Sequence, residues 1–271
     1  MNELRVRVLN NFGVGSAAVS CGRYGCGHIN ETYLVMTQLG KRYILQKINH
    51  AVFKDTDALM GNIEAVTTYL RQQTCDERRV MQLIKTKDGK SYFTDTEGAC
   101  WRIFAFVENS ICLQKPETPA DFYESAVAFG QFQQMLLNFP AETLYETIPN
   151  FHDTRDRYRI FREILRQDPM GRAKDVQPEI EFALAREKEA VTLVELLEAG
   201  KLPLRVTHND TKLNNVMLDA ETRTALCVVD LDTVMPGLSL YDYGDSIRFG
   251  AATAAEDEKD LSKMTLSLDL F

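Results

Sequence analysis

Residues 206–218 read VTHNDTKLNNVML, and residues 228–232 read VVDLD. Each stretch contains a short apolar run, as buried strands do, and a polar run that is typical of a loop at a strand end. The first loop carries Asp210, Lys212 and Asn215, and the second ends in Asp230. A carboxylate, a lysine, an amide and a second carboxylate are the side chains needed to hold Mg²⁺ and a polyphosphate. We therefore predict a phosphoryl-transfer site here.

The spacing of the first loop sharpens this prediction. His-x-Asp-x-Lys-x-x-Asn is the spacing of a protein-kinase catalytic loop, in which the Asp meets the substrate hydroxyl and the Asn binds Mg²⁺. In this chain those residues are Asp210 and Asn215, with Asp230 as the second Mg²⁺ ligand. The later motif is DLD where protein kinases have DFG, and no APE follows it. The pattern is kinase-like but excludes a protein kinase.

A turn rich in Asn and Asp is the alternative interpretation of the octapeptide 208–215, because these residues close loops and cap helices in many proteins. The octapeptide alone leaves both interpretations open. The DLD motif downstream supplies the structural context that a functional motif requires. We therefore favour the catalytic interpretation.

The hydrophobic pattern divides the chain into two lobes. Residues 1–107 predict a small antiparallel sheet with one helix, in which Asp55 caps a helix that carries Leu59, Ile63, Val66 and Leu70 on one face. Residues 108–271 predict a mostly helical lobe that holds the catalytic loop, with helices from Pro119, around residues 157–168, and across residues 178–199. The predicted fold class is α+β, with a hinge near residues 106–109.

Composition limits the classes of function. The 271 residues carry 31 Lys plus Arg against 39 Asp plus Glu, for a net charge of −8, so binding to nucleic acid or to anionic membrane is not expected. No apolar run is long enough to span a membrane and the first residues lack a signal peptide, so a cytoplasmic location is expected. Cys21, Cys26 and His28 supply only three of the four ligands of a structural zinc site. No zinc is predicted.

Several stretches resemble a known family. HNDTKLNN and VVDLD resemble the aminoglycoside phosphotransferase and choline kinase-like superfamily, which has a bilobal protein kinase-like fold. YGCGHINETYLV, RYILQKIN, IPNFHDT, LRVTHNDTKLNNVMLD and DLDTVMPGLSLYDYGDSIRFGA resemble bacterial N-acetylhexosamine 1-kinases more closely. The resemblance extends over nearly the whole chain. It implies ATP and Mg²⁺ as cofactors and a small-molecule sugar as the partner.

The resemblance also implies roles for individual residues. Asp210 is the catalytic base, Lys212 faces the transferred phosphate, and Asn215 and Asp230 bind the metal ion. The remaining implied roles are His208 and Asp242 as structural residues behind the loop, and His28, Arg248 and Phe249 as sugar contacts. Sugar recognition needs polar groups and an apolar wall, and these residue types supply both.

The nucleotide is expected in the first lobe. Gly25 and Gly27 lie in a glycine-rich turn between two predicted strands, which suits close approach of the backbone to a ligand, although the turn matches neither Walker A nor GxGxxG. Kinase-like lobes pair a basic residue on the third strand with a glutamate on the helix, and Glu64 is the predicted glutamate. Gln46 takes the position of the basic residue, and Lys47 beside it is expected to point to the other face.

The resemblance implies an ATP- and Mg²⁺-dependent kinase that phosphorylates the anomeric hydroxyl of N-acetylglucosamine or N-acetylgalactosamine. Two alternatives stay open: another small-molecule kinase that acts on an aminoglycoside, choline or homoserine, and a nucleotide-binding protein without turnover. The second alternative follows from the end of the chain, EDEKDLSKMTLSLDLF, where we expect the first turns of a helix and the family continues with further helices. The chain is therefore expected to be truncated.

Overall fold

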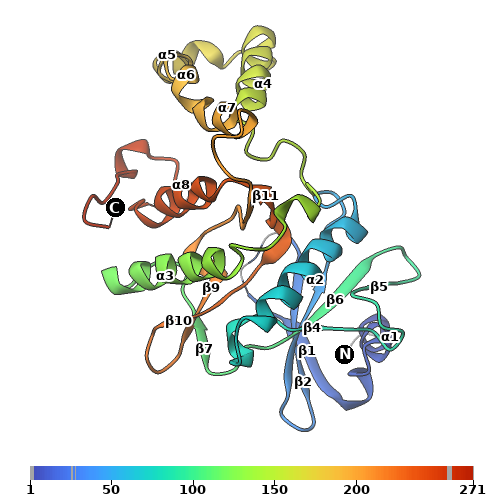
Figure 1. Ribbon diagram of the computed structural model, residues 1–271. Helices are drawn as coiled ribbons and strands as arrows, with labels where there is room; N and C mark the ends of the chain where they lie inside the picture. Colours follow the sequence, from blue (N-terminus) through green and yellow to red (C-terminus); the bar gives the residue numbers. More distant parts are fainter. Residues whose placement is uncertain (1–2, 26, 28, 255–257, 271) are drawn as a thin grey trace.

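The computed structural model describes residues 3–25, 27, 29–254 and 258–270 of the chain (Figure 1). Its N-terminal part is an antiparallel sheet with the strand order β1-β2-β3-β6-β4, and β5 pairs with β6. The strands are β1 Ala18–Arg23, β2 Glu31–Thr37, β3 Arg42–Lys47, β4 Leu83–Ile84, β5 Phe93–Thr94 and β6 Cys100–Ala105. The predicted antiparallel sheet is therefore present.

The two faces of this sheet bury different helices. Because side chains alternate along a strand, Leu45 and Trp101 point to one face, where they pack with α1 (Glu3–Asn11). Ile44 and Phe104 point to the other face, where they pack with α2 (Thr56–Gln72). Asp55 caps α2 by accepting a hydrogen bond from the Ala58 N–H at 2.9 Å, as its sequence predicts.

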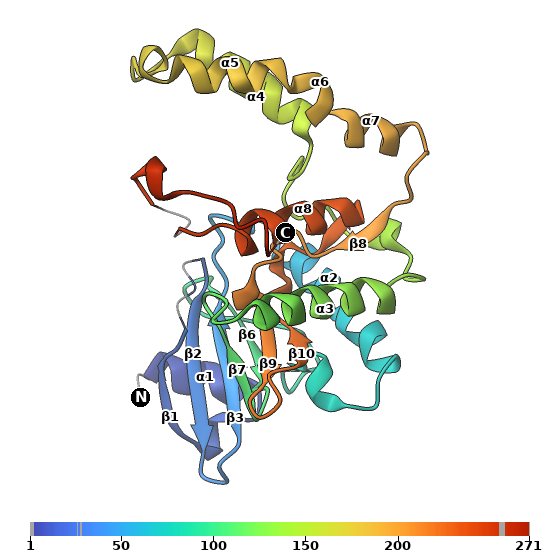
Figure 2. The same ribbon diagram turned by 90° about the vertical axis from the view of Figure 1, so that its left-hand side faces the viewer.

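The second part of the chain contains two small sheets and the helices that cover them. β7 (Ser110–Cys112), β9 (Val216–Asp219) and β10 (Ala225–Val228) form a three-stranded sheet, and β8 (Arg205–Thr207) pairs with β11 (Met235–Gly237). α3 (Pro119–Met135) packs on β10, and α8 (Ser239–Gly250) runs beside α3 (Figure 2). At Gly250 a Cβ atom would lie 1.7 Å from the Phe122 ring, so glycine permits this close approach.

One apolar core joins the two parts. Leu59, Ile63 and Val66 of α2 belong to the same buried cluster as Val216 and Leu218 of β9. Phe129 and Phe132 of α3 belong to it as well. The core therefore fixes α2 against the strands that carry the catalytic loop, which is the connection that positions the site.

The helices α4 (Thr154–Gln167), α5 (Gln177–Ala185), α6 (Glu187–Ala190) and α7 (Thr192–Glu198) form a group that stands apart from the three sheets (Figures 1 and 2). The single helix predicted over residues 178–199 is wrong, because the chain breaks at Arg186 and Val191. Hydroxyl groups of α4 bind carbonyls at both breaks: Tyr158 donates to Ala183 O at 2.8 Å and Thr154 to Ala190 O at 2.7 Å. Side chains that occupy helix carbonyls commonly interrupt a helix.

The predicted helix near the end of the chain is also wrong for the described residues. Only Leu261–Lys263 form one turn of 3₁₀ helix, and the chain then turns back so that Leu266 bridges to Ala252. The Asp260 carboxylate accepts from the Ser262 N–H at 3.1 Å, and the Thr253 hydroxyl contacts the Thr265 hydroxyl at 2.7 Å. These short polar side chains compete with helical hydrogen bonds. Among the described residues, no helix has the length and apolarity needed to cross a bilayer.

Candidate active site

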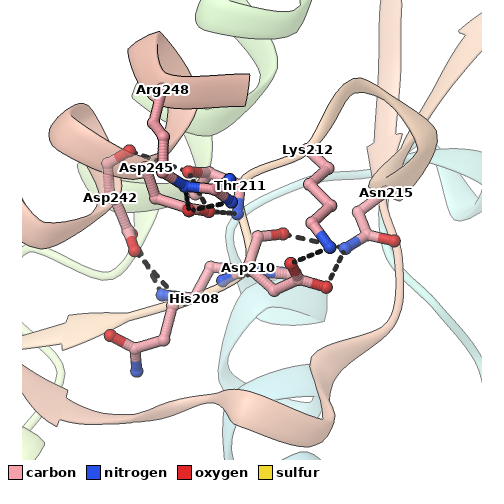
Figure 3. A network of polar contacts seen from close by, with 9 residues as sticks. His208, Asp210, Thr211, Lys212, Asn215, Asp242, Asp245 and Arg248 are labelled. Carbon is pink, nitrogen blue, oxygen red and sulfur yellow. Dashed lines mark hydrogen bonds and ion pairs between the residues drawn. The ribbon is translucent and has the colours of Figure 1, made fainter. Parts of the chain in front are cut away.

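The catalytic loop runs from β8 to β9 and is held from behind by Asp242 of α8 (Figure 3). The buried Asp242 carboxylate accepts hydrogen bonds from the His208 N–H at 3.0 Å and the Asn209 N–H at 2.8 Å. Gln133 of α3 donates to the same carboxylate at 2.8 Å. Asn209 has a left-handed backbone with φ 67°, which turns the chain toward Asp210. A buried acceptor thus fixes the start of the loop.

His208 is a structural residue in this geometry. Its side chain is fully buried, and its ring lies edge-to-face against Phe129 and Phe132. Nδ1 accepts from the Asp210 N–H at 3.3 Å, and Nε2 lies 2.9 Å from the carbonyl oxygen of Val229. These partners assign the proton to Nε2, since a carbonyl can only accept. The histidine therefore connects the catalytic loop to the segment that precedes Asp230.

Asp210, Asn215 and Lys212 lie together at the open side of the loop (Figure 3). Asn215 Nδ2 donates to the Asp210 carboxylate at 2.9 Å and to its backbone carbonyl at 2.8 Å. Lys212 Nζ lies 3.4 Å from the other carboxylate oxygen. The amide and the ammonium group fix the orientation of the carboxylate, and its side chain remains 31% exposed. An oriented, accessible carboxylate is what a general base requires.

Asp230 lies at the end of the strand segment that follows this loop. Its backbone is left-handed with φ 59°, and its side chain is exposed even though protein atoms crowd it. Desolvation, followed by the negative charges of Asp232 and Asp210, raises the pKa of Asp230, while Arg102 and Lys212 lower it. The influence of Asp210 and Lys212 places Asp230 close to the catalytic loop. The charges of Asp232 and Asp210 thus act on Asp230, which is the exposed member of the three.

The donor set fits Mg²⁺ with a nucleotide. Asn215 directs its amide nitrogen to Asp210 and its oxygen away from it (Figure 3), which leaves a ligand atom available. Asp230 supplies an exposed carboxylate whose charge repulsion a cation relieves. Among the described residues, no group of three or more His, Cys, Asp or Glu side chains could hold a metal ion by itself. Mg²⁺ takes one or two protein carboxylates and completes its shell with phosphate and water, so Asn215 and Asp230 are the side chains that would hold it.

The glycine-rich turn lies between β1 and β2 and is exposed. Gly25 has φ +77°, and a Cβ atom at Gly25 or Gly27 would meet no atom within 4 Å. The turn therefore has the space for a ligand that the sequence predicts. His28, the predicted sugar contact, lies outside the described residues.

Gln46 and Glu64, both predicted as nucleotide-binding residues, each bind a different partner. Gln46 on β3 binds Arg102 of β6, whose Nε donates to Gln46 Oε1 at 2.9 Å, whereas Glu64 pairs with Lys85. The strand–helix pair expected of Glu64 is therefore formed with Lys85, which directly follows β4, and not with Gln46 of β3. The nucleotide-binding roles of Gln46 and Glu64 stay predictions. Lys47 lies over the Trp101 ring on the opposite face from Gln46, as predicted.

Arg248 and Phe249 lie on α8 next to the catalytic loop. Lys212 Nζ is 5.9 Å from the centre of the Phe249 ring. Arg248 pairs with Asp245 at 2.8 Å, and Asp245 also accepts from the Thr211 N–H at 2.8 Å. The structure thus places Phe249 near Lys212 and connects Arg248 through Asp245 to Thr211 of the same loop.

Sequence reasoning missed residues that hold the site. Arg102 and Asp232 form a buried ion pair at 2.6 Å, and Asn30 donates to Asp232 at 2.6 Å. Asp245 binds the backbone of the catalytic loop. Asp232 is the second aspartate of DLD and Asp245 is the second aspartate of YDYGD, so both residues could have been identified from these motifs. Arg102 is the one charged residue in the apolar stretch ACWRIFAFV, and that isolated charge was the signal in the sequence that could have identified it.

The comparison with known families decides the membership of the chain. The model of the family described as "Phosphotransferase enzyme family" matches residues 22–263, which include the glycine-rich turn, the catalytic loop and Asp230. The chain belongs to this family. As a member of the phosphotransferase enzyme family it is a phosphotransferase, and the kinase-like site geometry agrees with that class.

Solved structures show the same fold. An aminoglycoside phosphotransferase from Alicyclobacillus acidocaldarius has a TM-score of 0.61 and 13% identity over 89% of this chain and 70% of its own. A microcompartment-associated aminopropanol kinase has a TM-score of 0.58 and 17% identity over 90% and 73%. The GDP complex of aminoglycoside 2'-phosphotransferase-IIIa has a TM-score of 0.59 and 15% identity over 90% and 77%. The predicted α+β, kinase-like bilobal fold is confirmed.

Proposed function

We propose that this phosphotransferase transfers the terminal phosphate of ATP to the anomeric hydroxyl of an N-acetylhexosamine and releases the sugar 1-phosphate and ADP. The observation that carries the proposal is the oriented Asp210 carboxylate, held by Asn215 and Lys212 beside Asp230. A solved relative complexed with GDP supports a nucleotide as the phosphate donor. The motifs that resemble N-acetylhexosamine 1-kinases support the choice of acceptor.

In this reaction Asp210 orients the sugar hydroxyl and accepts its proton. A hemiacetal hydroxyl is more acidic than an ordinary alcohol, so an ordinary carboxylate is a sufficient base. Lys212 lies beside Asp210 and faces the phosphate that is transferred. Asn215 and Asp230 would hold Mg²⁺, which supplies charge neutralisation at the phosphates when bound. Alignment by these fixed side chains provides most of the acceleration, because phosphoryl transfer depends chiefly on positioning and charge.

Residues on the acceptor side favour an uncharged sugar. Lys212 and Arg248 bring positive charge, and Phe249 offers an apolar wall. Asp245, the nearby carboxylate, already binds Arg248 and the Thr211 N–H. A cationic acceptor such as an aminoglycoside or choline requires carboxylates that are not already paired with a cation.

A panel of acceptors with detection of ADP tests this proposal. We expect turnover with N-acetylglucosamine or N-acetylgalactosamine, together with loss of the reducing end of the sugar. The matched control is the methyl glycoside of the same sugar, which lacks only the anomeric hydroxyl and is expected to be inert. Turnover of the methyl glycoside contradicts the anomeric position. Turnover confined to aminopropanol, choline, homoserine or an aminoglycoside establishes the other small-molecule kinase instead.

A noncatalytic role is separated by a second assay on the same sample. A ligand that binds the folded state raises its melting temperature. Stabilisation by ATP and Mg²⁺ without ADP release on any acceptor identifies a nucleotide-binding protein without turnover. The Asp210→Asn variant is the control for contaminating kinases, because it is expected to release no ADP.

A further inference from the structure

Arg102 is a buried cation that the proposed chemistry does not use. Its side chain is 1% exposed, in the middle of β6. Nε donates to Gln46 at 2.9 Å, and a terminal nitrogen pairs with Asp232 at 2.6 Å. The guanidinium also lies 5.2 Å from the centre of the Phe104 ring and contacts the Met60 sulfur at 3.8 Å. Asp232 is therefore the carboxylate that pairs directly with this buried charge.

Asp232 is held by the N-terminal part of the chain. It is 4% exposed, and Arg102 of β6 pairs with its Oδ1. Its Oδ2 accepts from Asn30 at 2.6 Å, at the end of the glycine-rich turn. Asn30 in turn accepts from the Asn49 N–H at 3.0 Å, beyond the end of β3. Two separate segments of the N-terminal sheet thus bind one side chain of the DLD motif.

The position of Asp232 controls Asp230. Only Leu231 separates the two aspartates, and it is buried in the core shared by α2 and β9. Asp230 has a left-handed backbone, a conformation that persists in a residue other than glycine when neighbouring contacts enforce it. With Leu231 and Asp232 both fixed, the backbone position from which the Asp230 side chain extends is fixed as well.

Stability alone does not account for this ion pair. Burial costs both charges their hydration, and a buried ion pair replaced by packed neutral side chains often leaves stability unchanged or improved. The same pair constrains geometry strongly, because Arg102 and Asn30 reach Asp232 from two elements. The Arg102–Asp232 ion pair is therefore better explained by the position in which it holds Asp232 than by a contribution to the free energy of folding.

We propose that Arg102, Asp232 and Asn30 form an interlobe latch that positions Asp230 relative to the glycine-rich turn. The latch takes the place of the strand–helix ion pair that Gln46 and Glu64 do not form. It rests on the proposed function in one respect, the assignment of Asp230 as a metal ligand. Its members are positioning residues, since Arg102 and Asp232 are buried and act on a ligand through Asp230 and the turn.

The test uses the double variant Arg102→Gln with Asp232→Asn. Removal of one partner leaves a buried, uncompensated charge, whereas the two neutral amides remove both charges together. Calorimetry measures the affinity for a non-hydrolysable ATP analogue with and without Mg²⁺. We expect the gain in affinity from Mg²⁺ to fall about tenfold or more, as when residues that orient metal ligands are removed. Affinity for the metal-free analogue is expected to change by less than about threefold, since no latch residue is assigned to bind the nucleotide.

The matched control is Arg155→Gln with Glu198→Gln, which removes the ion pair between α4 and α7, away from the site, by the same amide substitution. The control is expected to keep the full effect of Mg²⁺. A latch variant that melts as a folded protein and keeps the wild-type gain from Mg²⁺ overturns the proposal. A wild-type chain that binds no nucleotide overturns the proposed function instead.

Hydrogen exchange tests the latch without any ligand. In the latch variant, the amides of residues 229–234 and of residues 29–34 are expected to exchange faster together, because one side chain joins both segments. Faster exchange in only one of the two segments, or in neither, contradicts the latch even if the protein binds no nucleotide.

Discussion

The catalytic loop and the glycine-rich turn both border the proposed nucleotide site, but they are built in opposite ways. In the catalytic loop, Asp242, Asp245 and His208 bind successive backbone N–H groups of residues 208–211. In the turn, Gly25 and Gly27 are exposed and have open space around them. The rigid loop holds reacting groups in place before substrate arrives, whereas the open turn leaves room for the ligand.

The largest expected effect comes from the reacting group of the rigid loop. Asp210→Asn removes the proposed base and keeps the shape of the side chain, so we expect turnover to fall about 10³-fold. Affinity for Mg²⁺ and ATP is expected to stay within about threefold, because Asn215 and Asp230 are unchanged. Steady-state ADP release and calorimetry measure the two quantities. Near wild-type turnover would show that Asp210 is not the base.

The support of the rigid loop is the second target. Asp242→Ala leaves the His208 and Asn209 N–H groups and the Gln133 amide without their acceptor in a buried site. We expect the free energy of unfolding to fall by about 3 kcal/mol, since each buried donor left unsatisfied costs about 1–3 kcal/mol. Tyr243→Ala is the control, an exposed neighbour on the same helix. If chemical denaturation gives the same free energy of unfolding for the two variants, the supporting role of Asp242 is contradicted.

The Asp230 carboxylate, close to the catalytic loop, is expected to make the stability of the protein depend on pH. Desolvation and the charges of Asp232 and Asp210 raise the pKa of Asp230 to about 7. A raised carboxyl pKa means that the folded chain binds more protons than the unfolded chain, so stability is lost as pH rises from about 4 to 7.

Asp230→Asn removes this charge. Without metal at pH 7 we expect the variant to be more stable than the wild type by on the order of 1 kcal/mol, after discounting for the exposure of the side chain. At pH 4 the two proteins are expected to be equally stable. Thermal melts at both pH values in EDTA measure the difference. If the variant is less stable than the wild type at pH 7, the ionised Asp230 carboxylate does not destabilise the fold, and the account of its raised pKa is contradicted.

The smallest effect on stability is expected in the open turn. Gly25→Ala and its matched control Gly40→Ala each place alanine at a positive φ, +77° and +76°, with no atom within 4 Å. We expect each to lose about 1 kcal/mol of stability from backbone strain. Only Gly25→Ala is expected to weaken nucleotide affinity as well. Equal nucleotide affinity in the two variants would remove the turn from the binding site.

The same comparison shows which features of the fold and of the site could be predicted from the sequence. The catalytic loop was found because its spacing reflects a fixed geometry of a few consecutive residues. The N-cap Asp55 and the buried face of α2 were predicted because they depend on local periodicity. Local signals of this kind can be recognised in the sequence without knowledge of the rest of the fold.

Features that depend on contacts between distant elements were missed. The pairing of Arg102 with Asp232 joins residues of two lobes, and no spacing rule relates them. The pairing of Glu64 with Lys85 joins α2 to the segment after β4, and no local signal relates these two residues. The breaks of the helix over residues 178–199 depend on hydroxyls from α4. Each of these required the tertiary structure.

The central claim is that Asn215 and Asp230 hold one divalent ion at the phosphates of a bound nucleotide, next to Asp210. Anomalous diffraction from crystals grown with Mn²⁺ and a non-hydrolysable ATP analogue tests it most directly. We expect a metal peak about 2.0–2.3 Å from an Asn215 oxygen and from an Asp230 oxygen, at the ligand distances of hard divalent cations. A bound nucleotide whose metal ion contacts neither side chain would contradict the account.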